Sequence, residues 1–171
     1  MAELAEAAGV SRPILYDVFG DRAGVASALV KRFSAQLVPA IGAVFATDVP
    51  LREAVDRGID TFCVFVEKEP ALFRFLFGAA GDDANTMGTD LGEMFAAAFS
   101  ASLRAVKGDE SMGLTWGHAM PGLVFTAIEW WSSTRTMPRQ TLVAHLTSLV
   151  ADAFEAAGVT RLVPPSTRPA R

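Results

Sequence analysis

Residues 4–19 carry the spacing that most restricts how this chain can fold. The pattern predicts a first helix ending near Ala8, a tight turn in which Gly9 supplies a positive φ, and a second helix capped by Ser11. A small side chain at Ala5 permits a close crossing of the two helices. The apolar residues expected to seal that crossing are Leu4, Ala8, Val10, Leu15, Val18 and Phe19. The sequence therefore predicts a helix-turn-helix in this segment.

The outer face of the second helix is formed by Arg12, Pro13, Tyr16 and Asp17, with Ile14 at its border. In the major groove of a duplex, Arg12 can pair with guanine or a phosphate, and Tyr16 can donate its hydroxyl to a phosphate. Pro13 or Ile14 can contact a thymine methyl. Pro13 is compatible with a helix because it falls in the first turn. This face predicts double-stranded DNA as a partner.

The run Leu-Ala-x-x-Ala-Gly-Val-Ser-x-x-x-Leu-Tyr-x-x-Phe at residues 4–19 resembles the signature of the tetracycline-repressor (TetR) family of transcription regulators. The resemblance covers the first 33 residues well and the remainder in outline. It implies that Asp21 caps the next helix and that Arg22 lies near a phosphate. Gly24 falls in the first turn of that helix and is expected to weaken it by about 1 kcal/mol relative to alanine. The DNA-binding residues expected are Ser11, Arg12, Pro13, Ile14, Tyr16, Asp17 and Arg22.

Members of that family usually carry a further helix before this motif, so we expect the chain to begin at an internal methionine or to be a fragment. Residues 1–33 hold four acids and four bases and are neutral, whereas a DNA-binding domain usually has a basic footprint. A helical small-molecule-binding or interaction domain that no longer binds DNA therefore remains an alternative.

The composition indicates a cytoplasmic protein with no membrane segment. No apolar run approaches the roughly 18 residues that a membrane helix requires. Cys63 is the only cysteine of the 171 residues, which fits a reducing compartment and a buried apolar role. We divide the chain into a partial DNA-binding domain at 1–33, a ligand-binding and dimerisation domain at 34–158, and a disordered tail at 159–171.

Beyond residue 33 every segment is predicted to be helical, which makes the chain all-α: a helix-turn-helix followed by a helical ligand-binding and dimerisation bundle. Pro39 is expected to bend the first long helix, and Pro121 the penultimate one. The expected helices span residues 23–45, 51–67, 71–77, 114–133 and 138–157, and a further helix opens at Asn85 or Thr86 and has its clearest part at 91–106.

The last two predicted helices have broad apolar faces, with Gly113, Gly117 and Gly122 offering close approach. They can pair only with each other, or also with their copies in a second subunit as a four-helix bundle. We favour the homodimer, because residues 122–131 resemble the family's dimer-forming region and two recognition helices read a near-palindrome. The expected interface residues are Met120, Leu123, Ala127, Trp130, Leu142, Leu146, Leu149 and Ala153.

Aromatic and methionine side chains gather on the middle helices, where they fill an ordinary core or line a cavity for an apolar or planar small molecule. The candidate lining residues are Phe62, Phe65, Phe73, Phe77, Met94, Phe95, Phe99, Trp116 and His118. His118 fits a cavity or a satisfied interface position equally well.

We find no phosphate loop, nucleophile motif or metal-ligand spacing, and expect no enzyme activity, cofactor or metal. The expected function is a ligand-responsive repressor released from its operator by a small-molecule effector. An activator with the same fold is a second alternative.

Overall fold

The computed structural model describes residues 1–47, 49–78 and 82–163, without the side chains of residues 45, 75–78 and 82–91. Over this part the chain is helical, and its only β-type pairing is an isolated bridge between Pro50 and Arg161. The all-α prediction is confirmed. The helices are α1 (Ala2–Ala7), α2 (Arg12–Phe19), α3 (Arg22–Phe45), α4 (Leu51–Lys68), α5 (Pro70–Gly78), α6 (Asp82–Ala105), α7 (Glu110–Thr134) and α8 (Arg139–Ala156).

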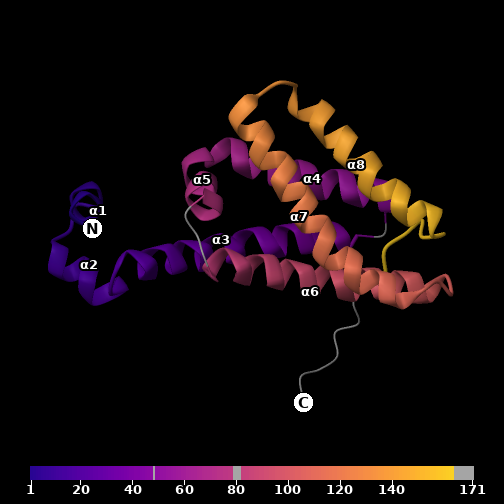
Figure 1. Ribbon diagram of the computed structural model, residues 1–171, viewed down its shortest axis with the longest axis horizontal. Helices are drawn as coiled ribbons and strands as arrows, with labels where there is room; N and C mark the ends of the chain where they lie inside the picture. The colour runs from indigo at the N-terminus through magenta and orange to yellow at the C-terminus, as the bar shows by residue number, and fades with distance from the viewer. Residues whose placement is uncertain (48, 79–81, 164–171) are drawn as a thin grey trace, which may run out of the picture.

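Helices α1 and α2 stand at one end of α3, and the remaining helices gather around its other half (Figure 1). The turn between α1 and α2 forms as predicted, because Gly9 adopts φ +66°, an angle that glycine takes without steric cost. Ser11 occupies the N-cap of α2, but its side chain accepts no amide hydrogen. The predicted side-chain cap is therefore wrong, although the helix starts where expected, with Pro13 in its first turn.

Helix α3 connects the two parts of the molecule. Asp21 caps it, as expected, with Oδ1 accepting the Gly24 amide hydrogen at 2.8 Å. Its buried residues recur at intervals of three and four, so one face of the helix enters the core. These residues are Val30, Phe33, Leu37 and Ile41.

In the body, α7 lies along α6 and α8 along α4. Glycines on α7 permit the first contact: a Cβ at Gly117 would lie 2.2 Å from the Ala96 nitrogen, and one at Gly113 would lie 2.4 Å from the Ser100 nitrogen. The predicted close approach is confirmed at these two positions. Gly122 has nothing within 4 Å of such a Cβ.

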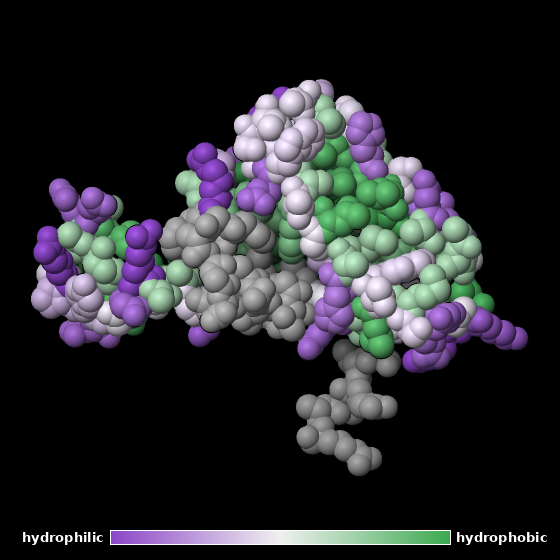
Figure 2. All heavy atoms as spheres, viewed as in Figure 1, coloured by the Kyte–Doolittle hydropathy of each residue, from purple (hydrophilic) through white to green (hydrophobic). Residues whose placement is uncertain are grey.

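The turn between α7 and α8 is anchored by Trp131, which is 1% exposed and donates its indole N–H to the Met137 carbonyl at 2.8 Å. Arg135 lies over the Trp131 ring at 4.1 Å and bonds Glu67 of α4 at 3.0 Å. From this turn the two helices diverge (Figure 1). Figure 2 shows hydrophobic surface in the space between them.

The segment after α8 packs against the body as far as residue 163. Val159 is fully buried, the Thr160 carbonyl accepts the Leu51 amide hydrogen at 2.8 Å, and the Val163 amide donates to Ser102 Oγ at 2.8 Å. The prediction of disorder from residue 159 is therefore wrong for these residues, because Val159 supplies an apolar anchor. The prolines and arginines beyond residue 163 lie outside the described residues. No helix in the described ranges is both long and apolar enough to span a membrane.

Candidate functional site

The first candidate surface is the outer face of α2. Arg12, Pro13, Tyr16 and Asp17 are all exposed and share one side of the helix through their spacing. Tyr16 is 49% exposed, and Ile14 at the border is 52% exposed. Ser11 and Arg22, at the two ends of the unit, are exposed as well. The structure thus presents all seven predicted DNA-binding residues to solvent.

The shape of this surface suits a duplex groove. An α-helix with its side chains is about 10–12 Å across, which matches the width of the major groove of about 12 Å. Helix α2 projects at the end of the molecule with no element of the body over its outer face (Figure 1). It can therefore enter a groove without displacing another part of the chain.

The inner side of this helix pair is less sealed than the sequence suggests. Only Ala5 and Leu15 are buried there, at 2% and 7% exposed. Leu4, Val10 and Val18 remain 40%, 38% and 65% exposed, so their predicted sealing role is wrong. The reason is geometric: helices of six and eight residues cover each other only where they cross.

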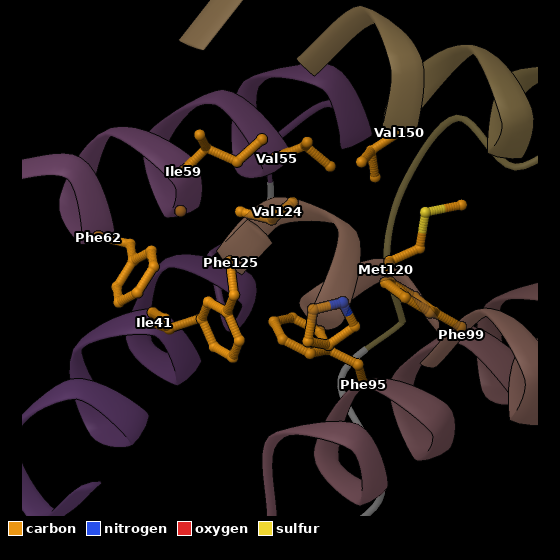
Figure 3. Close-up of a pocket in the computed structure, with 12 residues that line it drawn as sticks. Ile41, Val55, Ile59, Phe62, Phe95, Phe99, Met120, Val124, Phe125 and Val150 are labelled. Atoms are coloured by element: carbon orange, nitrogen blue, oxygen red, sulfur yellow. The ribbon is translucent and has the colours of Figure 1, made fainter. Parts of the chain in front are cut away.

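The second candidate site is an apolar cavity inside the body, with a volume of about 60 Å³. Five helices supply its walls, and Figure 3 shows their side chains converging on it. Its lining consists of Ile41 from α3; Val55, Gly58, Ile59 and Phe62 from α4; Phe95 and Phe99 from α6; Met120, Pro121, Val124 and Phe125 from α7; and Val150 from α8.

Aromatic rings dominate one side of the cavity. The Phe62 and Phe125 ring centroids are 4.8 Å apart, and those of Phe95 and Phe99 are 5.6 Å apart. Every lining side chain is apolar, so a polar group placed there would lose its hydrogen bonds to water without replacement. The lining is therefore chemically suited to a neutral apolar group and unsuited to a polar one.

The cavity takes three of the predicted ligand residues: Phe62, Phe95 and Phe99. Four others pack elsewhere. Phe65 packs against Phe33, Phe73 against Phe62, and Trp116 against Phe154. The ring centroids of these pairs are 4.2 Å, 5.8 Å and 4.6 Å apart, respectively. Met94 packs against the core without lining the cavity.

Of the two remaining predicted ligand residues, one lies away from this cavity and the side chain of the other is outside the described residues. His118 lies in an outer groove between α6 and α7, with Nδ1 2.3 Å from the position of a Cβ on Gly92. The side chain of Phe77 is outside the described residues.

The lining residues that sequence reasoning did not single out as ligand contacts are mostly aliphatic. Ile41, Val55, Ile59, Val124 and Val150 occupy ordinary buried or half-buried helical positions, and nothing in their spacing distinguishes a cavity wall from a filled core. Met120, expected at a dimer interface, also lines the cavity.

The predicted interface residues differ in burial. Leu123, Trp130 and Leu149 are 38%, 48% and 55% exposed. Ala127 and Ala153 are half-buried. Leu142 and Leu146 are already covered by the chain itself, at 4% and 5% exposed, because α8 packs on α4.

The one cysteine of the chain, Cys63, is buried in the body. Burial raises the pKa of the Cys63 thiol to about 12, so it stays protonated and poorly nucleophilic at neutral pH. Within the described residues there is no cluster of three His, Cys, Asp or Glu side chains suited to a metal ion.

Fold and site together define an all-helical protein with an exposed helix-turn-helix and an apolar cavity in its body. Residues 40–164 match the family model described as tetracyclin repressor-like, C-terminal domain. This match covers most of the chain, which therefore belongs to the tetracycline-repressor-like family.

Two curated relatives are named as uncharacterized helix-turn-helix-type transcriptional regulators of Mycobacterium tuberculosis, one from strain CDC 1551 / Oshkosh and one from strain H37Rv. Each is 25% identical to this chain over 154 residues, which is 87% of the chain. The chain spans 66% of the length of each relative.

Proposed function

We propose that this chain is part of a homodimeric, DNA-binding transcriptional repressor that a small apolar molecule releases from its operator. The observation that carries the proposal is the course of α3. One end of this helix joins α2, and the other end places Ile41 in the wall of the apolar cavity. A single helix thus connects the proposed DNA-reading surface with the proposed effector site.

The DNA-binding part rests on family membership, on the names of the two relatives and on the exposed face of α2. Arg12 is assigned to a guanine or a phosphate, Tyr16 and Arg22 to phosphates, and Pro13 or Ile14 to a thymine methyl. Ser11 and Asp17 flank these contacts. Two copies of α2, one helical turn of DNA apart, would read a near-palindromic operator.

The dimer is assigned to α7 and α8. Leu123 and Trp130 are seven residues apart on α7 and so share one side of that helix. They and Leu149 of α8 leave apolar side chains exposed. Burying these side chains against a second copy removes apolar surface from water, which favours association.

The effector acts by shifting a population between two conformations. A molecule that fits the cavity only when α3 has moved would favour the conformation in which the two α2 helices no longer match the operator spacing. Ile41 is the lining residue that α3 contributes, so it would carry the contact that moves the helix.

DNA binding is tested by an electrophoretic mobility-shift assay with the DNA upstream of the gene. Arg12→Ala is expected to weaken specific binding by about tenfold or more. Arg57→Ala removes the same charge from an exposed position on α4 and is the matched control. Equal losses in both variants would contradict the role of α2. Absence of specific binding by the wild-type protein would favour the alternative, a helical ligand-binding domain.

The cavity is tested with xenon as the probe, because a volume of about 60 Å³ admits a xenon atom, which dry apolar cavities bind. Xenon under pressure is expected to raise the melting temperature of the wild-type protein and of Thr115→Phe, whose site is exposed. Val124→Phe fills the cavity and should abolish the shift. A xenon effect that survives in Val124→Phe would show that the probe binds elsewhere.

Dimerisation is tested by sedimentation of Trp130→Glu beside Leu114→Glu. Both side chains are exposed, at 48% and 58%, but they lie on different sides of α7. Only Trp130→Glu is expected to yield monomers. Monomeric wild-type protein, or a dimer that tolerates Trp130→Glu, would overturn the assigned interface.

A further inference from the structure

The junction between α2 and α3 has an unusually tight geometry. Gly20 adopts φ +74° and ψ −70°, and the Asp21 amide donates to the Phe19 carbonyl at 2.9 Å. This is a three-residue γ-turn of the rare form that requires a positive φ at its centre. It turns the chain sharply between the last residue of α2 and the cap of α3.

The Phe19 carbonyl also lies directly against the first turn of α3. A Cβ placed on Gly24 would be 1.7 Å from the Phe19 oxygen and 2.9 Å from its carbonyl carbon. Both atoms belong to the backbone, so no side-chain rotation can relieve the collision. The Gly24 amide is bound to Asp21 Oδ1 at 2.8 Å, which holds this turn of α3 in place.

Helix propensity alone would favour another residue at this position. Glycine inside a helix is less stable than alanine, and Gly24 has an ordinary helical backbone with no positive φ. Space, not backbone conformation, is therefore what glycine provides here. Little else holds α2, because Leu15 is its one buried side chain.

We propose that Gly24 is a positioning residue that sets the angle of α2 on α3, an inference that rests on the proposed DNA-binding function. A side chain at position 24 pushes the Phe19 carbonyl away, opens the γ-turn and rotates α2. The same close contact makes the junction stiff, so that a displacement of α3 moves α2 with it.

The test is Gly24→Ala, with Ala23→Gly as the matched control. Ala23 is exposed in the same turn of α3, so its replacement lowers helix propensity without creating a collision. Tyr16 is the only tyrosine of the chain and lies on α2. Protein labelled with ¹⁵N-tyrosine therefore gives one amide resonance that reports on α2 without requiring DNA.

In Gly24→Ala the Tyr16 resonance is expected to shift strongly, while the melting temperature of the body stays unchanged. Specific binding to the upstream DNA should fall by about tenfold or more, while binding to unrelated duplex, which depends on phosphate contacts, changes little. Ala23→Gly should leave the resonance and both affinities near their wild-type values.

The inference is overturned by an unmoved Tyr16 resonance in Gly24→Ala or by an equal shift in Ala23→Gly. Unchanged specific binding in Gly24→Ala also overturns it when the wild-type protein binds DNA. If the resonance shifts as expected but the wild-type protein shows no specific binding, the junction geometry stands and the proposed function fails.

Discussion

The two ends of α3 differ in how firmly the chain holds them. Around α1 and α2, only Ala5 and Leu15 are buried. Around the other end, Phe33, Phe62, Trp131 and several more large side chains are less than 2% exposed. Because burial of apolar surface dominates folding stability, most of the free energy of folding resides in the body. The helix pair that would contact DNA buries few side chains and contributes little to that free energy.

The largest expected effect is in the body. Trp131→Ala removes a fully buried ring, its hydrogen bond to Met137 and its contact with Arg135, and should lower the free energy of unfolding by about 3–5 kcal/mol. Chemical denaturation followed by circular dichroism measures it. Leu114→Ala, at an exposed site on the same helix, is expected to have little effect. A similar loss in both variants would mean that α7 is held by contacts other than its buried face.

The next largest expected effect is a loss of stability in the α1–α2 helix pair, which distinguishes this end of α3 from the body. Leu15→Ala is expected to cost about 2 kcal/mol locally, because the small helix pair can partly collapse around the space. Hydrogen exchange should accelerate in α1 and α2, while the main denaturation transition stays in place. If the main transition shifts by the same amount, the helix pair and the body unfold as one unit and the contrast is lost.

The helix pair was largely predictable from local sequence signals. Gly9 at a positive φ, Pro13 in a first turn and Asp21 at an N-cap each constrain only their neighbours, so they can be interpreted without knowing the rest of the fold. Most helix boundaries in the body also followed from such signals, although α6 begins at Asp82, before the predicted opening at Asn85 or Thr86. Helix α7 starts at Glu110, four residues before the predicted start, because Asp109 caps it by accepting the Ser111 amide hydrogen at 2.9 Å.

The cavity was harder to predict because it depends on packing among five helices. Phe99 and Phe73 have the same character in the sequence, yet one lines the cavity and the other fills the core. The helix against which an amphipathic helix packs is equally hard to predict from the sequence. Leu142 and Leu146 mark the apolar face of α8, but the spacing does not indicate that α4, in the same chain, covers it.

A smaller effect concerns ion pairs that tie the α7–α8 turn to α4. Arg139 bonds Glu67 at 2.6 Å, and its Nε lies 2.9 Å from Asp60. Arg139→Met keeps most of the apolar stem and should lower the free energy of unfolding by about 1 kcal/mol. The loss should shrink in high salt, measured by denaturation at two ionic strengths. A loss independent of salt would indicate that packing, not charge, is what Arg139 contributes.

The smallest expected effect is on the pH dependence of the body. Hydrogen bonds from Arg52 and Ser148 hold the pKa of Asp152 below its usual 3.8, and the hydrogen bond from Arg104 holds that of Glu110 below its usual 4.5. A folded-state pKa below the unfolded one means that the folded protein binds the proton more weakly. The stabilisation is therefore complete above the usual values and disappears as the pH falls through the lowered ones.

Both carboxylates are exposed to solvent, so the change should be slight. Melting temperatures of the wild-type protein and of Asp152→Asn, measured from about pH 6 to about pH 3, should converge as the pH falls. Parallel curves for the two proteins would show that the pairing of Asp152 with Arg52 adds nothing to the stability of the body.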